Sequence, residues 1–569
     1  MVHTVAQQDG LNQTSTNKGP STTEPCLSMT KNPIGTNPKP VINIPTPIRP
    51  NVLARFLEGY DPQKTQHLVK GFTEGFSLGV TGQLFPAIYS NHPSVYTHSN
   101  FVQEKINKEL RLGQYKCPYT VPSLSNFVCS PLGVVPKKTQ NEFRIIHDLS
   151  YSKHGYSVNE LIPPENSTVS LETFDHVAAL VLKCGANCYV SKADIQESFR
   201  ILPISPLDYH KLGFSFDGHF YFDRVLPMGA SSSVQLFESF SSSLQWILQN
   251  KLNVHMVSHI IDDFISVNRL KSTCQASLTT FLNLCSDINI PIKHEKTCYP
   301  SQKAIVHGIE IDTCTLTAYL PGDKVSTLRR LLESAKRKKK IMLKDLQSLL
   351  GTLNFACKVI KPGRCFLRRL YDLTKGTTKP THYIKLTKET RADLALWSNF
   401  LDKYNGCTLL TNDRFISSAQ LNLYTDAAGT KGFGITHETS WAYGIFSTKV
   451  RKLHINILEL YPIAVAVMLF GKQWSNKNIL FVCDNLAIVY CLQKQTSKDP
   501  IIMKLIRLIV LQSLEHNFCF TSKHIPSKEN SVCDKLSRFQ IEEALVEAPY
   551  LQNRPLHIPD DLSPDALLL

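Results

Sequence analysis

The sequence predicts an α+β protein of several domains, and three observations indicate this class. Between about residues 115 and 321, short β-rich runs alternate irregularly with helical patches, which favours α+β over a regular βαβ series. After residue 321, apolar residues recur at spacings of three and four with basic residues between them, a pattern typical of packed helices. From residue 421 the pattern resets to strands followed by helices. A chain of 569 residues is also too long for one core.

The chain divides into six predicted segments. They are a disordered arm (1–50), a helical N-terminal extension (51–115), the β-rich region (116–320), a helical region (321–415), a compact mixed-sheet domain (418–540) and a C-terminal tail (541–569). The arm is rich in Thr, Pro, Asn and Ser and has few aromatic residues, so it cannot build a core. The tail after about residue 548 is rich in Pro, which predicts a mobile end.

The composition indicates a partner that carries negative charge and an intracellular location for the protein. The formal net charge is +15 and the isoelectric point is near 9.0, which fits a channel that binds phosphates, although solubility alone also accounts for such an excess. The 16 cysteines form no CxxC pair, so neither a zinc finger nor a disulfide scaffold is predicted. Lys504 and Arg507 interrupt the run IIMKLIRLIVLQSL, and no membrane span or signal peptide is expected. We therefore expect a cytoplasmic or nuclear protein.

Single carboxylates inside apolar stretches form two sets. The first set is Asp194 in KADIQESFRILPI with Asp262 and Asp263 in SHIIDDFISVN. The second set is Asp426 in LYTDAAG, Glu459 in NILELYPIAVAV, Asp484 in ILFVCDN and Asp534 in NSVCDKLSR. Carboxylates brought together repel one another unless cations neutralise them, and two divalent ions about 3.5–4 Å apart clamp the reacting oxygens of a phosphodiester. The sequence therefore suggests two phosphoryl-transfer sites.

The Asp262–Asp263 pair needs a particular local structure. Successive residues of a strand point to opposite faces, so a regular strand cannot bring both carboxylates to one metal. A tight hairpin at the pair removes this difficulty, and the apolar flanks HII and FISV supply two buried strands.

The first set resembles the catalytic motifs of reverse transcriptases, with motif A at Asp194, motif B at LPMGASSSVQLF and motif C at IIDD. The resemblance implies a right-hand polymerase of fingers, palm and thumb, in which the three aspartates are catalytic. It also departs from the family's pattern, because Ile260 opens motif C where a tyrosine is usual. Met228 stands where retroviral enzymes carry a polar residue, which puts fidelity and nucleotide affinity in doubt.

The same resemblance assigns further residues to substrate binding. Lys137 and Arg144 match the fingers residues that grip the incoming triphosphate, although KKTQNEFR also reads as a charged hairpin tip. Phe199 falls at the steric-gate position, with an ordinary core phenylalanine as the alternative. Met228 and Gly229 lie in motif B, where glycine lets the backbone approach the nucleotide. Lys296 resembles the motif D lysine that protonates pyrophosphate, and VHGIEID resembles the primer-gripping turn.

The second set resembles the four acids of ribonuclease H. The implied fold is a ribonuclease H-like α/β domain that follows the polymerase. The segment HIPSKENSVCDKLSR is similar to the shortened form of retrotransposons, in which the catalytic-loop histidine is missing; Lys528 lies near that place, and His524 is expected at a strand end. The order of the two domains most resembles DIRS-like retrotransposons.

The expected function is RNA-directed DNA synthesis with a fused ribonuclease H. The expected cofactors are two Mg²⁺ ions at each site, with Mn²⁺ as the alternative metal. The expected partners are an RNA template, a DNA primer, the RNA–DNA hybrid, dNTPs and a separately encoded tyrosine recombinase, with no membrane. The alternatives are a domesticated, inactive nucleic-acid-binding remnant and an incomplete genomic copy. Lys336 to Lys340 read as a nuclear import signal, a phosphate-facing strip or a solvated helix face.

Overall fold

The computed structural model describes residues 44–569 apart from 117, 123, 138–141, 154, 404, 406–415, 476 and 517. Most of the predicted arm, the tip of KKTQNEFR and the predicted boundary near residue 415 therefore lie outside the described residues. Residues 44–49 do not belong to a disordered arm. Ile48 is buried, and the Thr46 hydroxyl donates to the Ile201 carbonyl at 2.7 Å. The arm's predicted end at residue 50 is wrong because Ile48 enters the apolar core.

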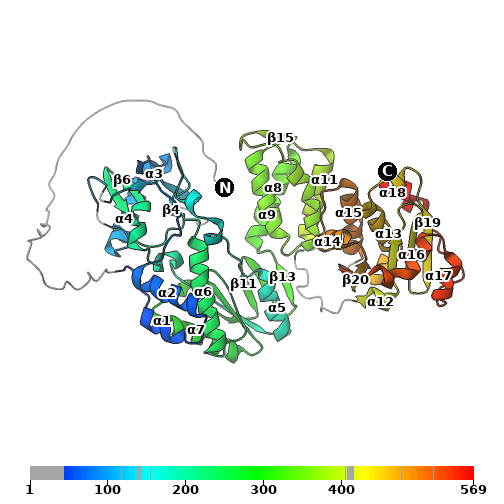
Figure 1. Cartoon of the computed structure of the whole chain (residues 1–569), viewed down its shortest axis with the longest axis horizontal. Helices are drawn as coiled ribbons and strands as arrows, with labels where there is room; N and C mark the ends of the chain where they lie inside the picture. The colour runs from blue at the N-terminus through cyan, green and yellow to red at the C-terminus, as the bar shows by residue number, and fades with distance from the viewer. Residues whose placement is uncertain are drawn as a thin grey trace, which may run out of the picture. The chain divides into compact units, whose positions relative to one another are not determined.

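Four helices form the N-terminal region, with one short strand between them. They are α1 (Pro50–Phe56), α2 (Pro62–Glu74), α3 (Pro93–Thr97) and α4 (Ser99–Arg111), and the strand is β1 (Ala87–Ile88). The start of α2 is fixed locally, because the Asp61 side chain accepts a hydrogen bond from the Lys64 amide and a proline follows it. Leu68 and Phe72 of α2 are buried in the same core as α6 (Ser233–Asn250). Figure 1 shows α1 and α2 beside α6 and α7 (Lys271–Ile288).

A four-stranded antiparallel sheet lies at the centre of the β-rich region. Its strand order is β10 (Cys298–Ser301), β5 (Tyr189–Asp194), β9 (Asp263–Asn268) and β8 (Val257–Ile260). Helices α6, α7 and α5 (Phe174–Cys184) pack against these strands. Because β5 and β9 are the two inner strands, their ends place the first set of carboxylates side by side.

The β-rich region contains two further β structures beside the central sheet. One is the hairpin of β3 (Leu132–Pro136) and β4 (Phe143–His147), and the other is a sheet in the order β1, β2 (Val128–Cys129), β6 (Gly213–Phe216) and β7 (His219–Phe222). The hairpin packs on the N-terminal helices through a small core that includes Val95, Ile106 and Leu132.

A three-stranded antiparallel sheet leads into the helical region. Its strands are β11 (Lys303–Val306), β12 (Ile309–Asp312) and β13 (Thr317–Tyr319). The elements that follow are α8 (Gly322–Arg337), β14 (Lys340–Met342), α9 (Leu343–Ala356), α10 (Arg368–Asp372), β15 (Tyr383–Lys385) and α11 (Lys388–Lys403). Helix α8 packs on both α9 and α11, and Figure 1 shows the three side by side.

The C-terminal region consists of antiparallel and parallel strands with helices on both faces. Strands β17 (Tyr424–Ala427), β18 (Gly432–His437) and β19 (Ser440–Ile445) are antiparallel, whereas β16 (Ile416–Ser417), β20 (Asn478–Cys483) and β21 (Cys519–His524) are parallel. These are two separate three-stranded sheets, and β17 of the first lies beside β20 of the second. The helices are α13 (Ile455–Phe470), α14 (Leu486–Lys494), α15 (Pro500–Glu515) and α16 (Ser531–Ser537).

Helix α13 is the buried centre of this region. Phe433 of β18 packs edge-on against Tyr461 of α13, with ring centroids 4.9 Å apart. Among the described residues, the segment Ile455–Trp474 is long and apolar enough by composition to cross a membrane, and 67% of its most apolar window is buried. Sequence reasoning considered the run IIMKLIRLIVLQSL and overlooked this longer apolar segment. The segment is apolar all round because it is enclosed by protein.

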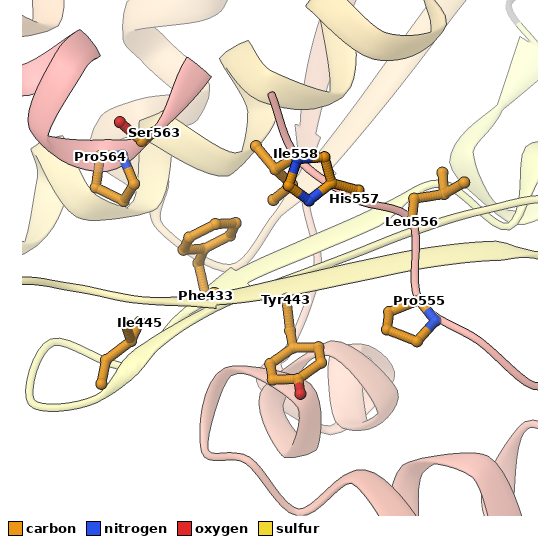
Figure 2. Close-up of a pocket in the computed structure, with 10 residues that line it drawn as sticks. Phe433, Tyr443, Ile445, Pro555, Leu556, His557, Ile558, Ser563 and Pro564 are labelled. Carbon is orange, nitrogen blue, oxygen red and sulfur yellow. The ribbon is translucent and has the colours of Figure 1, made fainter. Parts of the chain in front are cut away.

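The C-terminal tail is packed rather than mobile. Helices α17 (Ile541–Glu547) and α18 (Pro564–Leu568) lie in it, Leu562 and Leu568 are buried, and Tyr461 donates to the Leu562 carbonyl at 2.6 Å. The tail borders a pocket of about 480 Å³, and in Figure 2 Phe433 lies on the same side of the strands as Ser563 and Pro564. None of the predicted carboxylates lines this pocket.

Candidate active sites

Three aspartates of the first set meet at the end of the central sheet. Asp194 is the last residue of β5 and pairs in register with Asp263, the first residue of β9. Ile260 pairs with Asp263 across the β8–β9 hairpin, so Ile261 and Asp262 form a two-residue turn. The Asp262 carbonyl accepts a hydrogen bond from the Ile195 amide at 3.0 Å, which ties the turn to the end of β5. The predicted tight hairpin is confirmed.

Lysine ammonium groups form ion pairs with two of these carboxylates. Lys192 lies 2.7 Å from Asp263 Oδ2, and Lys296 lies 3.0 Å from Asp194 Oδ2. Asp263 Oδ1 is buried without a hydrogen-bond partner. A buried carboxylate oxygen with no donor is costly unless a cation approaches it. Lys192 was not identified from the sequence. It lies two residues before Asp194 in β5, so the two side chains point to the same face of the sheet.

Burial and mutual repulsion disfavour the ionised forms of Asp262 and Asp263. Burial, with the Asp194 charge next in size, raises the pKa of Asp262 to about 6. The pKa of Asp263 is also raised by burial, although Lys192 opposes the shift. A divalent cation favours the charged forms of carboxylates that burial and mutual repulsion otherwise disfavour. These residues therefore fit a metal site.

The Lys296 amine is held as a cation. Its hydrogen bond to Asp194, the largest cause, raises the pKa of this lysine above its ordinary value. Lys296 lies in a short 3₁₀ turn, His294–Lys296, directly before β10. A charged amine beside the carboxylates is suited to donate a proton or to contact a phosphate.

Phe199 and the motif B residues lie near the start of α6. Phe199 is half-buried, with its ring centroid 5.5 Å from that of Phe237 on α6. Met228 is 51% exposed. A Cβ on Gly229 would lie 2.0 Å from the His147 carbonyl oxygen, so glycine is required there by the protein's own backbone. This packing reason is additional to the expected approach of a nucleotide.

Lys137 and Arg144 lie on the β3–β4 hairpin. Both are exposed; Lys137 follows β3 directly, and Arg144 in β4 pairs with Val135. Lys137 Nζ lies 3.1 Å from Glu142 Oε2. The hairpin is a separate two-stranded sheet. Lys137 and Arg144 therefore lie together on the exposed hairpin and outside the carboxylate cluster.

The second set is only partly gathered. Asp426 is in β17, Glu459 is in α13, Asp484 follows β20 and Asp534 is in α16. Among the described residues, one group of three potential metal ligands has its atoms within 4.8 Å of one another, and it consists of Glu459, Asp484 and Cys483. Sequence reasoning missed Cys483, which is adjacent to Asp484. The aspartates of the first set are thus more widely separated than this group.

Within the second set, the pKa shift is largest at Glu459. Burial, followed by the charges of Asp426 and Asp484, raises the pKa of Glu459 to about 9. Burial likewise raises the pKa of Asp426 to about 6, although Ser537 donates to it at 2.7 Å. The four carboxylates therefore repel one another across the end of the sheet, and their donor set fits a divalent cation.

The other two acids of the second set have protein partners. Arg538 Nη2 lies 2.8 Å from Asp534 Oδ1, and Ser527 donates to Asp484 Oδ2 at 2.8 Å. His524 ends β21, as predicted, and its Nε2 lies 3.0 Å from the Asp484 carbonyl. Asp534 is bound by Arg538 on its own helix, one turn away.

The class of protein follows from this geometry and from a family model. Residues 135–311, which include all three aspartates of the central sheet, match the model of the reverse transcriptase (RNA-dependent DNA polymerase) family. Residues 135–311 therefore match a reverse transcriptase domain, and the predicted α+β class is confirmed by the mixture of helices and antiparallel sheets. The central sheet lies wholly within the matched residues.

Particular relatives come from two virus groups. The chain is 24% identical over 293 residues to Protein P of heron hepatitis B virus, covering 51% of this chain and 35% of that protein. It is 24% identical over 372 residues to Protein P of duck hepatitis B virus (isolate white Shanghai duck S31), with coverages of 63% and 43%. The Gag-Pro-Pol polyprotein of mouse mammary tumor virus (strain BR6) is 22% identical over 312 residues, with coverages of 53% and 16%. The chain thus spans less than half the length of these relatives.

Among solved structures, the chain is similar to those of foamy viral protease-reverse transcriptases. One in complex with double-stranded DNA has a TM-score of 0.49 and 16% identity, with 86% of this chain and 84% of that chain covered. One in complex with an RNA/DNA hybrid has a TM-score of 0.48 and 15% identity, with coverages of 90% and 64%.

Proposed function

We propose that this protein is an RNA-directed DNA polymerase with a fused ribonuclease H. The observation that carries the proposal is the register of Asp194 with Asp263 beside a turn that contains Asp262, inside the matched reverse transcriptase domain. Extension of a DNA primer on an RNA template by the purified chain tests it. Incorporation of dNTPs that depends on the template is the expected result, and its absence with Mg²⁺ and Mn²⁺ would contradict the polymerase assignment.

In the polymerase site, Asp194, Asp262 and Asp263 are the residues that would hold Mg²⁺. When bound, the metal supplies charge stabilisation at the reacting phosphate and lowers the pKa of the primer hydroxyl. Lys192 and Lys296 already neutralise Asp263 and Asp194, so they keep the carboxylates together before a metal arrives. Lys296 holds its proton at Nζ, which suits the predicted role of protonating pyrophosphate. Lys137 and Arg144 would bind the β- and γ-phosphates.

In the second site, Asp426, Glu459, Asp484 and Asp534 would cleave the RNA strand of a hybrid. The support is an antiparallel sheet beside a parallel one, with strands and helices in the predicted order along the chain, and two carboxylates, Asp426 and Glu459, whose pKa values are raised by burial. Mg²⁺ is again the proposed cofactor. Asp534 must leave Arg538 to join the other three acids.

Salt should weaken binding of an RNA–DNA hybrid steeply. Lysines and arginines displace counterions from phosphates, so affinity falls with a power of the salt concentration. For about six phosphate contacts, affinity should fall roughly a thousandfold between 50 and 200 mM salt. Fluorescence anisotropy of a labelled hybrid measures this dependence. An affinity that stays flat over that range would contradict a groove that follows the phosphates.

Replacing Phe199 by Val should admit ribonucleotides. A ring below the incoming sugar excludes the 2′-hydroxyl, and a clash of this kind is worth about 1–3 kcal/mol in discrimination. The measurement is the ratio of kcat/KM for dNTP and rNTP in parent and variant. Phe240→Val is the matched control, because it opens a cavity in the same core at a buried ring of α6 outside the Phe199–Phe237 pair. An unchanged ratio in Phe199→Val would assign Phe199 to the core.

We also propose which type of retrotransposon encodes this protein and in which compartment the protein acts. The motif order supports a DIRS-like retrotransposon, with a separately encoded tyrosine recombinase as partner and a cytoplasmic or nuclear site of action. Lys338, Lys339 and Lys340 are exposed at the junction of α8 and β14, where they are accessible both to an import receptor and to phosphates. The inactive-remnant alternative predicts hybrid binding without primer extension, so the same assay separates it.

A further inference from the structure

The turn that carries Asp262 has an unfavourable backbone at its first residue. Ile261 has a φ of +56°, in the left-handed region. Two-residue hairpin turns place Gly, Asn or Asp at positive φ, because a branched side chain crowds the backbone there. Isoleucine is branched at Cβ, so this turn persists only where its surroundings hold it.

The main contact that holds the Ile261 peptide comes from helix α6. Ser241, which is fully buried, donates its hydroxyl to the Ile261 carbonyl at 2.6 Å. A buried serine in a helix ordinarily bonds a carbonyl one turn earlier on its own helix. Ser243 does so, donating to the Phe240 carbonyl at 2.7 Å. Ser241 instead uses its hydroxyl on the turn.

Two other residues on α6 fix the strand that enters the turn. Glu238 and Gln245 lie three residues before and four residues after Ser241, so all three share one helix face. His259 of β8 lies between them; its Nε2 is 2.8 Å from Glu238 Oε1, and its Nδ1 contacts Gln245 Oε1. His259 and Glu238 are both buried.

Gln245 links His259 to a second carboxylate, that of Glu172. Gln245 donates from Nε2 to Glu172 Oε1 at 2.9 Å, which leaves its Oε1 facing His259. The His259 ring is therefore held from both sides, by the Glu238 carboxylate at Nε2 and by the Gln245 amide oxygen at Nδ1. Glu172 also accepts from the His259 amide at 3.3 Å. A buried network of this kind is directional and fixes one position of β8, which an apolar contact would not do.

We propose that Ser241, supported by the Glu238–His259 pair, is a positioning residue for the catalytic turn. It touches neither substrate nor metal and acts through the Ile261 peptide, which orients the next residue, Asp262. The proposal rests on the proposed polymerase function. It predicts that the chemical step is sensitive to a side chain on the far side of the turn from the nucleotide.

The test compares Ser241→Ala with Ser243→Ala. The two changes delete the same hydroxyl from the same helix at fully buried positions, and they differ in whether the turn loses its donor. We expect kcat for single-nucleotide incorporation, measured per active site from burst amplitudes, to fall about tenfold in Ser241→Ala, equivalent to one hydrogen bond. The dNTP KM and primer-template affinity should stay unchanged. Ser243→Ala should retain the parental kcat.

A second comparison uses the strained residue itself. In an Ile261→Gly background the turn no longer needs restraint, because glycine adopts positive φ without strain. Adding Ser241→Ala to that background should therefore lower kcat less than it does in the parent, a coupling that a double-mutant cycle measures. A readout independent of activity is the rise in melting temperature on adding Mg²⁺ without nucleic acid. This rise should be smaller in Ser241→Ala than in Ser243→Ala.

Three outcomes would overturn the inference. Equal kcat in Ser241→Ala and Ser243→Ala, with an active parent, would remove the positioning role and leave the polymerase function intact. Full additivity in the cycle would show that Ser241 does not act through Ile261. A folded parent without primer extension would overturn the proposed function and this inference together. If Ser241→Ala fails to fold, Ser241→Cys, which keeps a weaker donor, takes its place with an intermediate kcat expected.

Discussion

Replacing Asp262 by Asn should abolish DNA synthesis while RNA cleavage in a hybrid continues. The substitution keeps the size of the side chain and removes its charge from the turn beside Asp194. Loss of one group that stabilises developing charge costs about 10²–10³ in rate, and a direct ligand should cost at least that much. Primer extension and hybrid cleavage are measured on the same preparation. Synthesis should fall below about a thousandth of the parental rate.

Asp217→Asn is the matched control for this variant. Asp217 is also an aspartate in a hairpin turn, between β6 and β7, but it is exposed and outside the carboxylate cluster. Its replacement should leave both activities at the parental level. Loss of both activities in a folded Asp262→Asn protein would contradict two separate sites.

Replacing Glu459 by Gln should abolish RNA cleavage and leave DNA synthesis. Burial and the neighbouring acids raise the pKa of Glu459 to about 9, so at neutral pH the metal-free glutamate holds a proton. Binding of Mg²⁺ must release that proton, and the apparent Mg²⁺ affinity of the parent should therefore increase as pH rises toward 9. The variant has no such proton. Hybrid cleavage at several pH values and Mg²⁺ concentrations measures both effects.

The same variant should be more stable than the parent. A carboxyl group with a raised folded-state pKa destabilises the fold above its unfolded pKa, because folding must take up a proton or bury a charge. At pH 7 this cost is at most about 3 kcal/mol, and glutamine avoids it. Thermal unfolding without Mg²⁺ measures the gain, with Glu542→Gln on the exposed face of α17 as control. Parental cleavage rates in Glu459→Gln would contradict the second site.

Local chemistry accounts for what the motifs could predict. Asp262 and Asp263 needed a hairpin because strand residues alternate in direction, and that argument requires only sequence spacing. The match of residues 135–311 agrees with the resemblance drawn from motifs A, B and C. Arg538 and Lys192 were not found, because ion pairs one turn apart on a helix or across two strands carry no motif of their own.

Some segments were misjudged because local composition competes with long-range packing. The tail after residue 548 is rich in Pro, yet Leu562 and Leu568 enter the core around α13. Residues 44–49 likewise join the core through Ile48. Apolar side chains separated by more than a hundred residues from their partners give no signal in a local window.

By itself, the sequence predicted the α+β class, three aspartates in an arrangement that resembles the reverse transcriptase motifs, and a later set of strands and helices that carry four more acids. Those features depend on residue type and spacing along the chain. Only the tertiary structure decided that Cys483 stands with Glu459 and Asp484, that Lys192 neutralises Asp263, and that Ser241 reaches the Ile261 carbonyl. These contacts join separate elements, and their distances depend on how helices and strands pack, which residue spacing does not specify.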